Sequence, residues 1–152
     1  MEQVGGDKKE ARAYIEPEIP LGEISRIWFK VLNESTDLGA YRMYIGATKE
    51  ITSKVDLGSS WLGFLPHDWS MHLFEGNIEN NKTWKKHFQF EGENVGAGTG
   101  DLVEVQVDRM KGKITFWING QTIGPAFESE DIKTGKMYFA ISLGNFGQQL
   151  LI

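Results

Sequence analysis

Alternating apolar and polar residues around Asn119-Gly120 most constrain how this chain can fold. Every second residue of 102–108 is valine, and every second residue of 113–118 is isoleucine or phenylalanine. A period of two is typical of β-strands with one buried face. Asn-Gly tolerates the two positive φ angles of a type I′ turn. We therefore expect a β-hairpin centred on Asn119-Gly120.

The register of this hairpin follows from a two-residue turn. The expected pairs are Ile118 with Gln121, Phe116 with Ile123, and Ile114 with Pro125. Such pairing would place Phe116 and Ile123 on the same face of the sheet. With a bend at Lys111-Gly112, the sequence predicts three consecutive antiparallel strands in residues 100–127.

Other short apolar runs, separated by turn signals, continue the same pattern. The expected strands are 24–32, 41–47, 61–65, 71–74, 84–90, 137–143 and 149–152, and the expected loops include 66–70, 75–82 and 128–135. Short strands separated by frequent turns are typical of an antiparallel sandwich. The expected fold class is therefore all-β, an antiparallel two-sheet β-sandwich.

Several of these residues also resemble a known family. The residues that carry the resemblance are Gly100-Asp101, the alternating valines, Lys111-Gly112, Phe116, Asn119-Gly120, Gly124, Ala126-Phe127 and the segment 137–144. In this spacing they resemble the central block of a SPRY domain and the strand that follows it. The resemblance extends over residues 24–152 and implies two curved antiparallel sheets packed face to face. We expect an N-terminal tail with an edge strand at 1–22 and a SPRY-like β-sandwich at 23–152.

Composition narrows the classes of partner. The chain has 152 residues, no cysteine and a net charge of −5. Its length fits one domain. No cluster of Lys and Arg indicates binding to nucleic acid or an anionic membrane, and no apolar run approaches the roughly 18 residues of a membrane helix. The absence of cysteine and of a secretory signal favours a cytoplasmic location. We expect a monomer, or a segment of a larger protein.

No residue pattern predicts catalysis, a metal site or a cofactor. The glycine-rich stretch 96–100 precedes a strand, whereas a phosphate-binding loop opens a helix. His67 and His72 would lie on opposite faces of a strand, which does not suit a zinc site. Glu128 and Glu130 have the spacing of an acid pair in a glycosidase, but they lie in a charged loop. We therefore expect that the protein is not an enzyme.

The SPRY resemblance implies a module that recognises a partner protein or short peptide. In SPRY domains that bind peptides, loops at one end of the sandwich make a shallow pocket, and two of these match residues 66–70 and 144–147. The binding residues implied by these two loops are His67, Asp68, Trp69, Asn145, Phe146 and Gly147, and the resemblance adds Asn33 and Glu34 from the first polar loop. The two aromatic rings would supply apolar contact, and the histidine, aspartate and Asn145 would hold polar groups of the peptide.

Two other functions share this architecture, because a fold does not determine a function. A carbohydrate-binding sandwich could use Trp69 with Asp68 and Asn77 as its platform. Alternatively, the chain could be a structural domain docked within a larger protein. Trp69 itself could point outward from its predicted loop or fold back onto the core. Trp28 lies in an apolar strand, and we expect it in the core.

Overall fold

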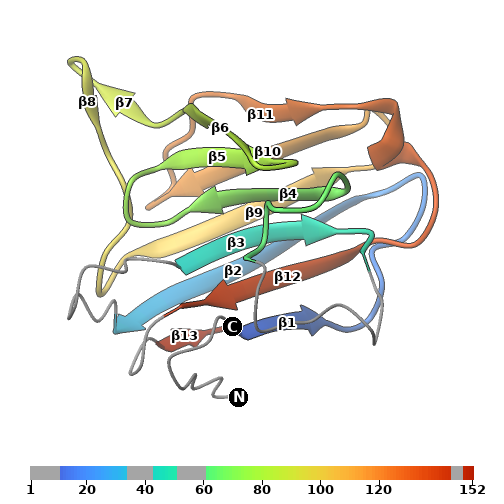
Figure 1. Ribbon diagram of the computed structural model, residues 1–152, viewed down its shortest axis with the longest axis horizontal. Helices are drawn as coiled ribbons and strands as arrows, with labels where there is room; N and C mark the ends of the chain where they lie inside the picture. The colour runs from blue at the N-terminus through green and yellow to red at the C-terminus, as the bar shows by residue number, and fades with distance from the viewer. Residues whose placement is uncertain (1–10, 34–42, 51–60, 145–148) are drawn as a thin grey trace.

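Two antiparallel sheets pack against each other and remain open at their edges (Figure 1). The computed structural model describes residues 11–33, 43–50, 61–144 and 149–152. In spatial order, sheet A contains β1 (Ala11–Ile15), β12 (Tyr138–Leu143), β3 (Met43–Thr48), β4 (Asp68–His72), β5 (Asn77–Asn80) and β6 (Thr83–Lys86). Sheet B contains β11 (Pro125–Glu128), β10 (Lys113–Ile118), β9 (Leu102–Asp108), β2 (Ile24–Asn33) and β13 (Gln149–Leu151). The other elements in these ranges are a hairpin of β7 (Gln89–Phe90) and β8 (Glu93–Asn94), and the 3₁₀ helix η2 (Glu130–Lys133). The predicted fold class is confirmed.

The hydrophobic core lies between the two sheets and contains alternate residues of their strands. Val105 and Phe116 of sheet B belong to the same cluster as Ile45 and Met71 of sheet A, and all four are 0% exposed. Burying a side chain of this size contributes about 1.5–3 kcal/mol. The alternation that predicted strands β9 and β10 thus also identified the residues that hold the two sheets together.

The predicted turn at Asn119-Gly120 is present. The φ angles are 49° at Asn119 and 79° at Gly120, and Ile118 bridges to Gln121 as expected. The Asn119 Oδ1 accepts a hydrogen bond of 2.9 Å from the Leu102 N–H, which ties the turn to the start of β9. The asparagine therefore both tolerates the backbone conformation and fastens the hairpin to the sheet.

Beyond this turn, the predicted register is wrong. Ile114 pairs with Phe127 rather than with Pro125, and a bulge separates it from the next pair. Proline has no N–H for the ladder, so the chain leaves the regular pairing before β11 begins. As a result, Phe127 packs against Phe116, with ring centroids 6.4 Å apart, and Ile123 is 47% exposed.

Four segments differ from the sequence prediction. The strand expected at 61–65 is a series of turns, with φ of 108° at Gly63. The loop expected at 66–70 includes the start of β4, and the loop expected at 75–82 includes β5. The loop expected at 128–135 contains η2, which Ser129 caps by accepting a 3.1 Å hydrogen bond from the Asp131 N–H. The elements β5 and η2 were not predicted because each buries a single apolar side chain, Ile78 and Ile132.

Trp28 was expected in the core, and this prediction is wrong. Its neighbour Phe29 is 0% exposed, whereas Trp28 is 49% exposed on the outer face of sheet B, opposite Glu104. Successive residues of a strand face opposite sides, so only one of the two aromatic residues could be buried.

The edge strand predicted near the N-terminus is β1, which pairs with β12 along sheet A. The proposed boundary between residues 22 and 23 stays a prediction. In the described ranges, no helix has the length and apolar character needed to cross a membrane.

Candidate functional site

The segments predicted to form one pocket do not come together where the structure describes them. Asp68 pairs with Thr48, which pairs with Tyr138 at the start of β12, whereas Gly144 follows the end of that strand. A six-residue strand is about 20 Å long. Figure 1 shows β4 and β12 running in the same direction, so Asp68 and Gly144 lie at opposite ends of sheet A.

The other predicted binding residues are not brought to the start of β4 by the described structure either. Asn33 ends β2 and pairs with Gln149 of β13. Glu34, Asn145, Phe146 and Gly147 lie outside the described residues. Only His67, Asp68 and Trp69 can therefore be placed together, at the start of β4.

Asp68 differs from its predicted role, because its side chain is fully buried and has internal partners. The carboxylate accepts hydrogen bonds of 2.6 Å from Arg12 and 2.6 Å from Thr48. It also accepts hydrogen bonds from the backbone N–H groups of Gly63 and Leu65, at 3.2 and 3.1 Å. Asp68 thus fastens β1 and the segment before β4 to sheet A, and it does not present a charge to a partner.

Trp69 folds onto the core, which was one of the two alternatives that the sequence left open. Along β4, Trp69 and Met71 belong to the core cluster, and Trp69 is 3% exposed. Asp68 and Asn77 are also buried, at 0% and 8% exposure. The platform expected for the carbohydrate-binding alternative is therefore not displayed to solvent.

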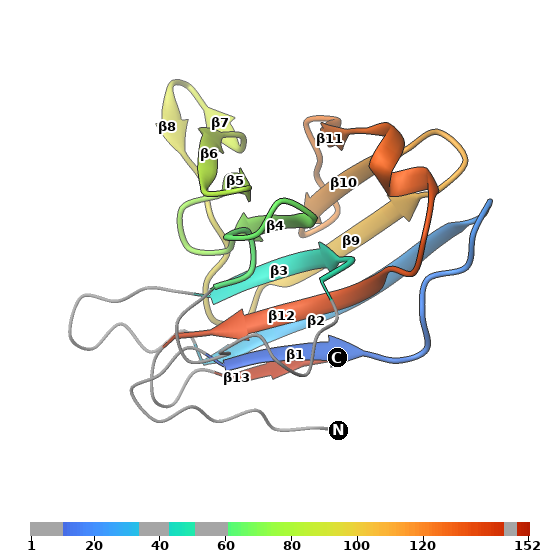
Figure 2. The ribbon, with the colours of Figure 1, turned by 45° about the vertical axis from the view of Figure 1, so that its right-hand side comes forward.

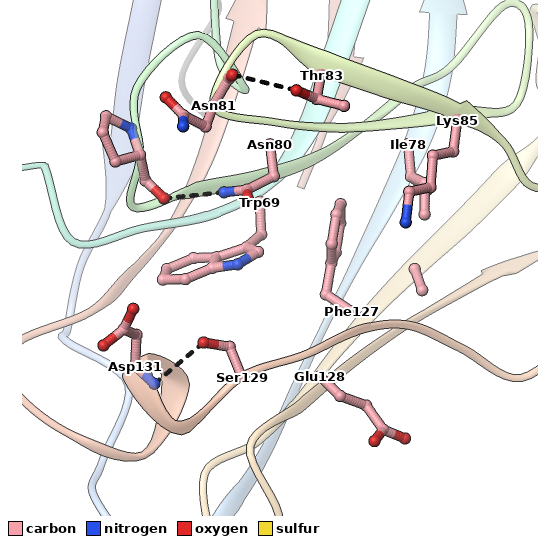
Figure 3. A pocket seen from close by; sticks show the side chains of 12 residues that line it. Trp69, Ile78, Asn80, Asn81, Thr83, Lys85, Phe127, Glu128, Ser129 and Asp131 are labelled. Carbon is pink, nitrogen blue, oxygen red and sulfur yellow. Dashed lines mark hydrogen bonds between the residues drawn. The ribbon is translucent and has the colours of Figure 1, made fainter.

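A groove of about 460 Å³ opens beside Trp69, between the free edges of the two sheets. We call it the edge groove; its lining residues are Pro66, Trp69, Ile78, Asn80, Asn81, Thr83, Lys85, Ala126, Phe127, Glu128, Ser129 and Asp131. Figure 2 shows β6 and β11 on the two sides of this opening, and Figure 3 shows the rings of Trp69 and Phe127 within it. The groove combines an aromatic floor with a polar rim.

The wall from sheet A is the hairpin of β5 and β6. Its two-residue turn has positive φ angles, 51° at Asn81 and 63° at Lys82. The Asn80 side chain donates hydrogen bonds to the carbonyl oxygens of Pro66 and Asp68, at 2.9 and 2.6 Å. These contacts hold the hairpin against the start of β4, so the wall and the floor form one unit.

The wall from sheet B is β11 together with η2. The buried Arg109 guanidinium donates hydrogen bonds to the carbonyl oxygens of Ile132, Thr134 and Gly135, at 2.9, 2.8 and 2.5 Å. Guanidinium suits this task because its donors are arranged in a rigid planar fork. Arg109 thereby fixes the helix that carries Asp131 into the groove.

Charged groups gather at one end of the groove. His67 is partly exposed, with its Nδ1 3.2 Å from Glu50 and its Nε2 3.8 Å from Asp131. On the opposite wall, Lys85 forms no ion pair with any other described residue. The rim therefore has an acidic side, where Asp131 lies beside His67, and a basic side, where Lys85 has no described ion-pair partner.

Of the predicted binding residues, Trp69 lines the edge groove and His67 lies beside it at Asp131, and the predicted pocket included neither wall. Asp131 lies in a charged segment predicted as a loop, Thr83 lies next to a predicted strand and Lys85 within it, and no spacing in the sequence relates them. Their association arises from the order of strands in the two sheets. Within the described residues, no group of three His, Cys, Asp or Glu side chains could hold a metal ion.

Comparison with solved structures identifies the fold. The SPRY domain of human HERC1 matches with a TM-score of 0.69 and 14% sequence identity, over 97% of this chain and 89% of that chain. A second human SPRY domain matches with a TM-score of 0.69 and 12% identity, over 96% of this chain and 85% of that chain. No protein-family model and no curated protein matches the sequence. Over nearly its whole length, the chain has a SPRY-like fold, as its central block predicted.

Proposed function

We propose that this chain is a non-catalytic interaction module that binds a partner protein or short peptide in the edge groove. SPRY domains generally act as interaction domains, and this resemblance supports the class of function. The observation that carries the proposal is the groove of about 460 Å³ with Trp69 and Phe127 in its lining. Recesses that combine apolar lining with a few convergent polar groups are the usual binding sites of proteins.

The predicted binding residues have different roles in this proposal. Trp69 lines the groove from the core side, at 3% exposure, and His67 lies beside the groove at Asp131. Asp68 positions the strand that carries Trp69. Contact through Asn33, Glu34, Asn145, Phe146 and Gly147 stays a prediction for a second surface. A cytoplasmic location stays our expectation, from the absence of cysteine.

The experiment compares two charge reversals on exposed strand lysines. Lys85 lines the edge groove, whereas Lys30 lies on β2, opposite Leu102 of β9. The wild-type chain, Lys85→Glu and Lys30→Glu are used as baits in lysate, and bound proteins are quantified by mass spectrometry. We expect specific partners that bind the wild type and Lys30→Glu but are lost with Lys85→Glu.

Two results would contradict the proposal. Equal recovery of the partners by all three baits would place the binding surface outside the edge groove. Recovery of no specific partner by the wild type would contradict the interaction function itself. Cooperative unfolding of each bait is the control that the fold is intact.

A second candidate function is docking against a neighbouring domain of a larger protein. The outer face of sheet B carries four large exposed side chains, Ile24, Trp28, Leu32 and Leu102, at 40–49% exposure. Exposed apolar patches of this kind commonly mark interaction surfaces. Cross-linking of protein purified from its natural source tests this candidate. Links from Lys30 to residues outside this sequence would support docking, and a Lys30 without such links would contradict it.

A further inference from the structure

The edge strand β6 leaves one side of its backbone available next to the edge groove. All four of its residues are exposed. It pairs with β5 on one side, and within the described part of the chain no strand pairs with its other side. An unpaired strand edge is a template for another strand, because its N–H and C=O groups lack partners.

The hairpin turn determines which backbone groups are available. With a two-residue turn, Asn80 and Thr83 form the hydrogen-bonded pair that closes the hairpin. Hydrogen-bonded and non-hydrogen-bonded pairs alternate along an antiparallel ladder. The N–H and C=O groups of Trp84 and Lys86 therefore point away from β5, toward the free side.

We propose that the partner segment binds as an added β-strand, paired with the free edge of β6 and with alternate side chains in the edge groove. The proposal rests on the proposed function and specifies how the partner is held. Thr83 and Lys85 of β6 line the groove. A strand added beside them would direct every second side chain toward the same space, where Phe127 lies.

The charge at this edge specifies the partner. Lys85 and Lys86 are adjacent on β6, and neither forms an ion pair with another described residue. On the opposite wall, Glu128 is already 3.2 Å from Lys113. A second copy of β6 would bring like charges together, which disfavours self-pairing. The occupant is therefore an extended acidic segment of another protein, with apolar residues at alternate positions and Asp or Glu near Lys85.

The experiment starts from a phage-displayed library of random 12-residue peptides, selected on the wild-type chain. We expect selected peptides with alternating apolar residues and at least one Asp or Glu. Amide hydrogen exchange of the wild-type chain, measured by NMR, should slow at Trp84 and Lys86 when a synthesised peptide binds. Exchange at Thr83, which already pairs within the hairpin, is the internal control.

A matched pair of variants isolates the backbone contact. Trp84→Pro removes the outward N–H, whereas Trp84→Ala removes the same side chain and keeps the N–H. We expect Trp84→Pro to bind the peptide about tenfold more weakly than Trp84→Ala, as for one lost hydrogen bond. If Trp84→Pro does not fold, N-methylation of single amides in the peptide removes the corresponding N–H donors from the peptide instead, and the affinity for the wild-type chain is measured.

The outcomes distinguish this inference from the proposed function. Peptides that require Lys85 but leave exchange at Trp84 and Lys86 unchanged would overturn strand addition while supporting the groove. Equal affinity of Trp84→Pro and Trp84→Ala would likewise overturn it. A selection that yields no peptide specific for the wild-type chain would overturn both.

Discussion

At the scale of single residues, the buried pair of Arg12 and Asp68 joins β1 to the start of β4. Both side chains are 0% exposed and their atoms lie 2.6 Å apart. Removing one member of a buried pair leaves the other charge without compensation, at a cost of about 3–5 kcal/mol. We therefore expect Asp68→Ala to lower the free energy of unfolding by about that amount in urea titration. Asp131→Ala is the control: that side chain is 62% exposed, and its loss should cost about 0.5 kcal/mol or less. Equal effects would show that Asp68 is not an anchor.

A second residue, His87, should make stability depend on pH. Burial lowers the pKa of His87 from its ordinary value of 6.5, and a hydrogen bond with the Gly124 backbone opposes this shift only in part. Below pH 6.5 the unfolded chain therefore binds a proton that the folded chain does not, so stability falls as the pH decreases from 6.5 toward the lowered pKa. We expect His87→Gln to reduce this loss, by at most about 1.4 kcal/mol per pH unit, in urea titrations at pH 7 and pH 5. Parallel pH profiles for the two proteins would contradict the assignment.

At the scale of elements, Arg109 joins the end of β9 to η2 and to the segment after β1. Its guanidinium donates hydrogen bonds to Ile132, Thr134 and Gly135, and a further one of 2.8 Å to the Ile19 carbonyl oxygen. Lysine keeps the charge but cannot reach all of these acceptors together. We expect Arg109→Lys to reduce the free energy of unfolding by about 3 kcal/mol, because buried carbonyl groups lose their donors.

Arg26→Lys is the matched control for this element. The Arg26 side chain is 52% exposed and lies 3.5 Å from Glu104, so its replacement should cost about 0.5 kcal/mol or less. Thermal unfolding of both variants measures the difference. A small effect of Arg109→Lys would mean that η2 is held by other contacts.

The elements also show how far the sequence alone could lead. Strands β9 and β10 were predictable because their apolar residues alternate and bury completely. Strand β5 was not, since Ile78 is its only apolar residue and its other members are polar. The register of β11 was also not predictable, because a bulge and Pro125 interrupt the pairing that the Asn119-Gly120 turn alone would set. The local sequence pattern predicts a strand when one whole face of that strand is apolar and buried. It does not predict a strand whose position depends on pairing with neighbouring strands.

At the scale of the whole molecule, the edge groove exists only because both sheets stay open on the same side. Trp69 and Phe127 come from different sheets, and the polar rim comes from two further segments. The sequence showed that Trp69 lies close to His67, but it could not indicate that β6 and β11 would be the edge strands beside the groove. Of the predicted binding residues, only Trp69 lines this candidate site, and its two walls were not predicted.

The two layers give Trp28 and Phe29 opposite environments, although they are adjacent in the chain. Phe29 is 0% exposed between the sheets, and Trp28 is 49% exposed on the outer face of sheet B. Truncating a buried aromatic residue costs about 3–5 kcal/mol, so Phe29→Ala should lose that much stability. Trp28→Ala should lose about 1 kcal/mol, because its ring leaves solvent only in part. Urea unfolding of the two variants compares them directly.

The Trp28→Ala variant also tests which surface binds the partner. Trp28 lies on β2, on the outer face of sheet B, and does not line the edge groove, so partners that depend on Lys85 should bind Trp28→Ala as they bind the wild type. If Trp28→Ala lost those partners while it still unfolded cooperatively, the outer face of sheet B would be the binding surface. Docking through that face would then explain why four large side chains remain exposed on it.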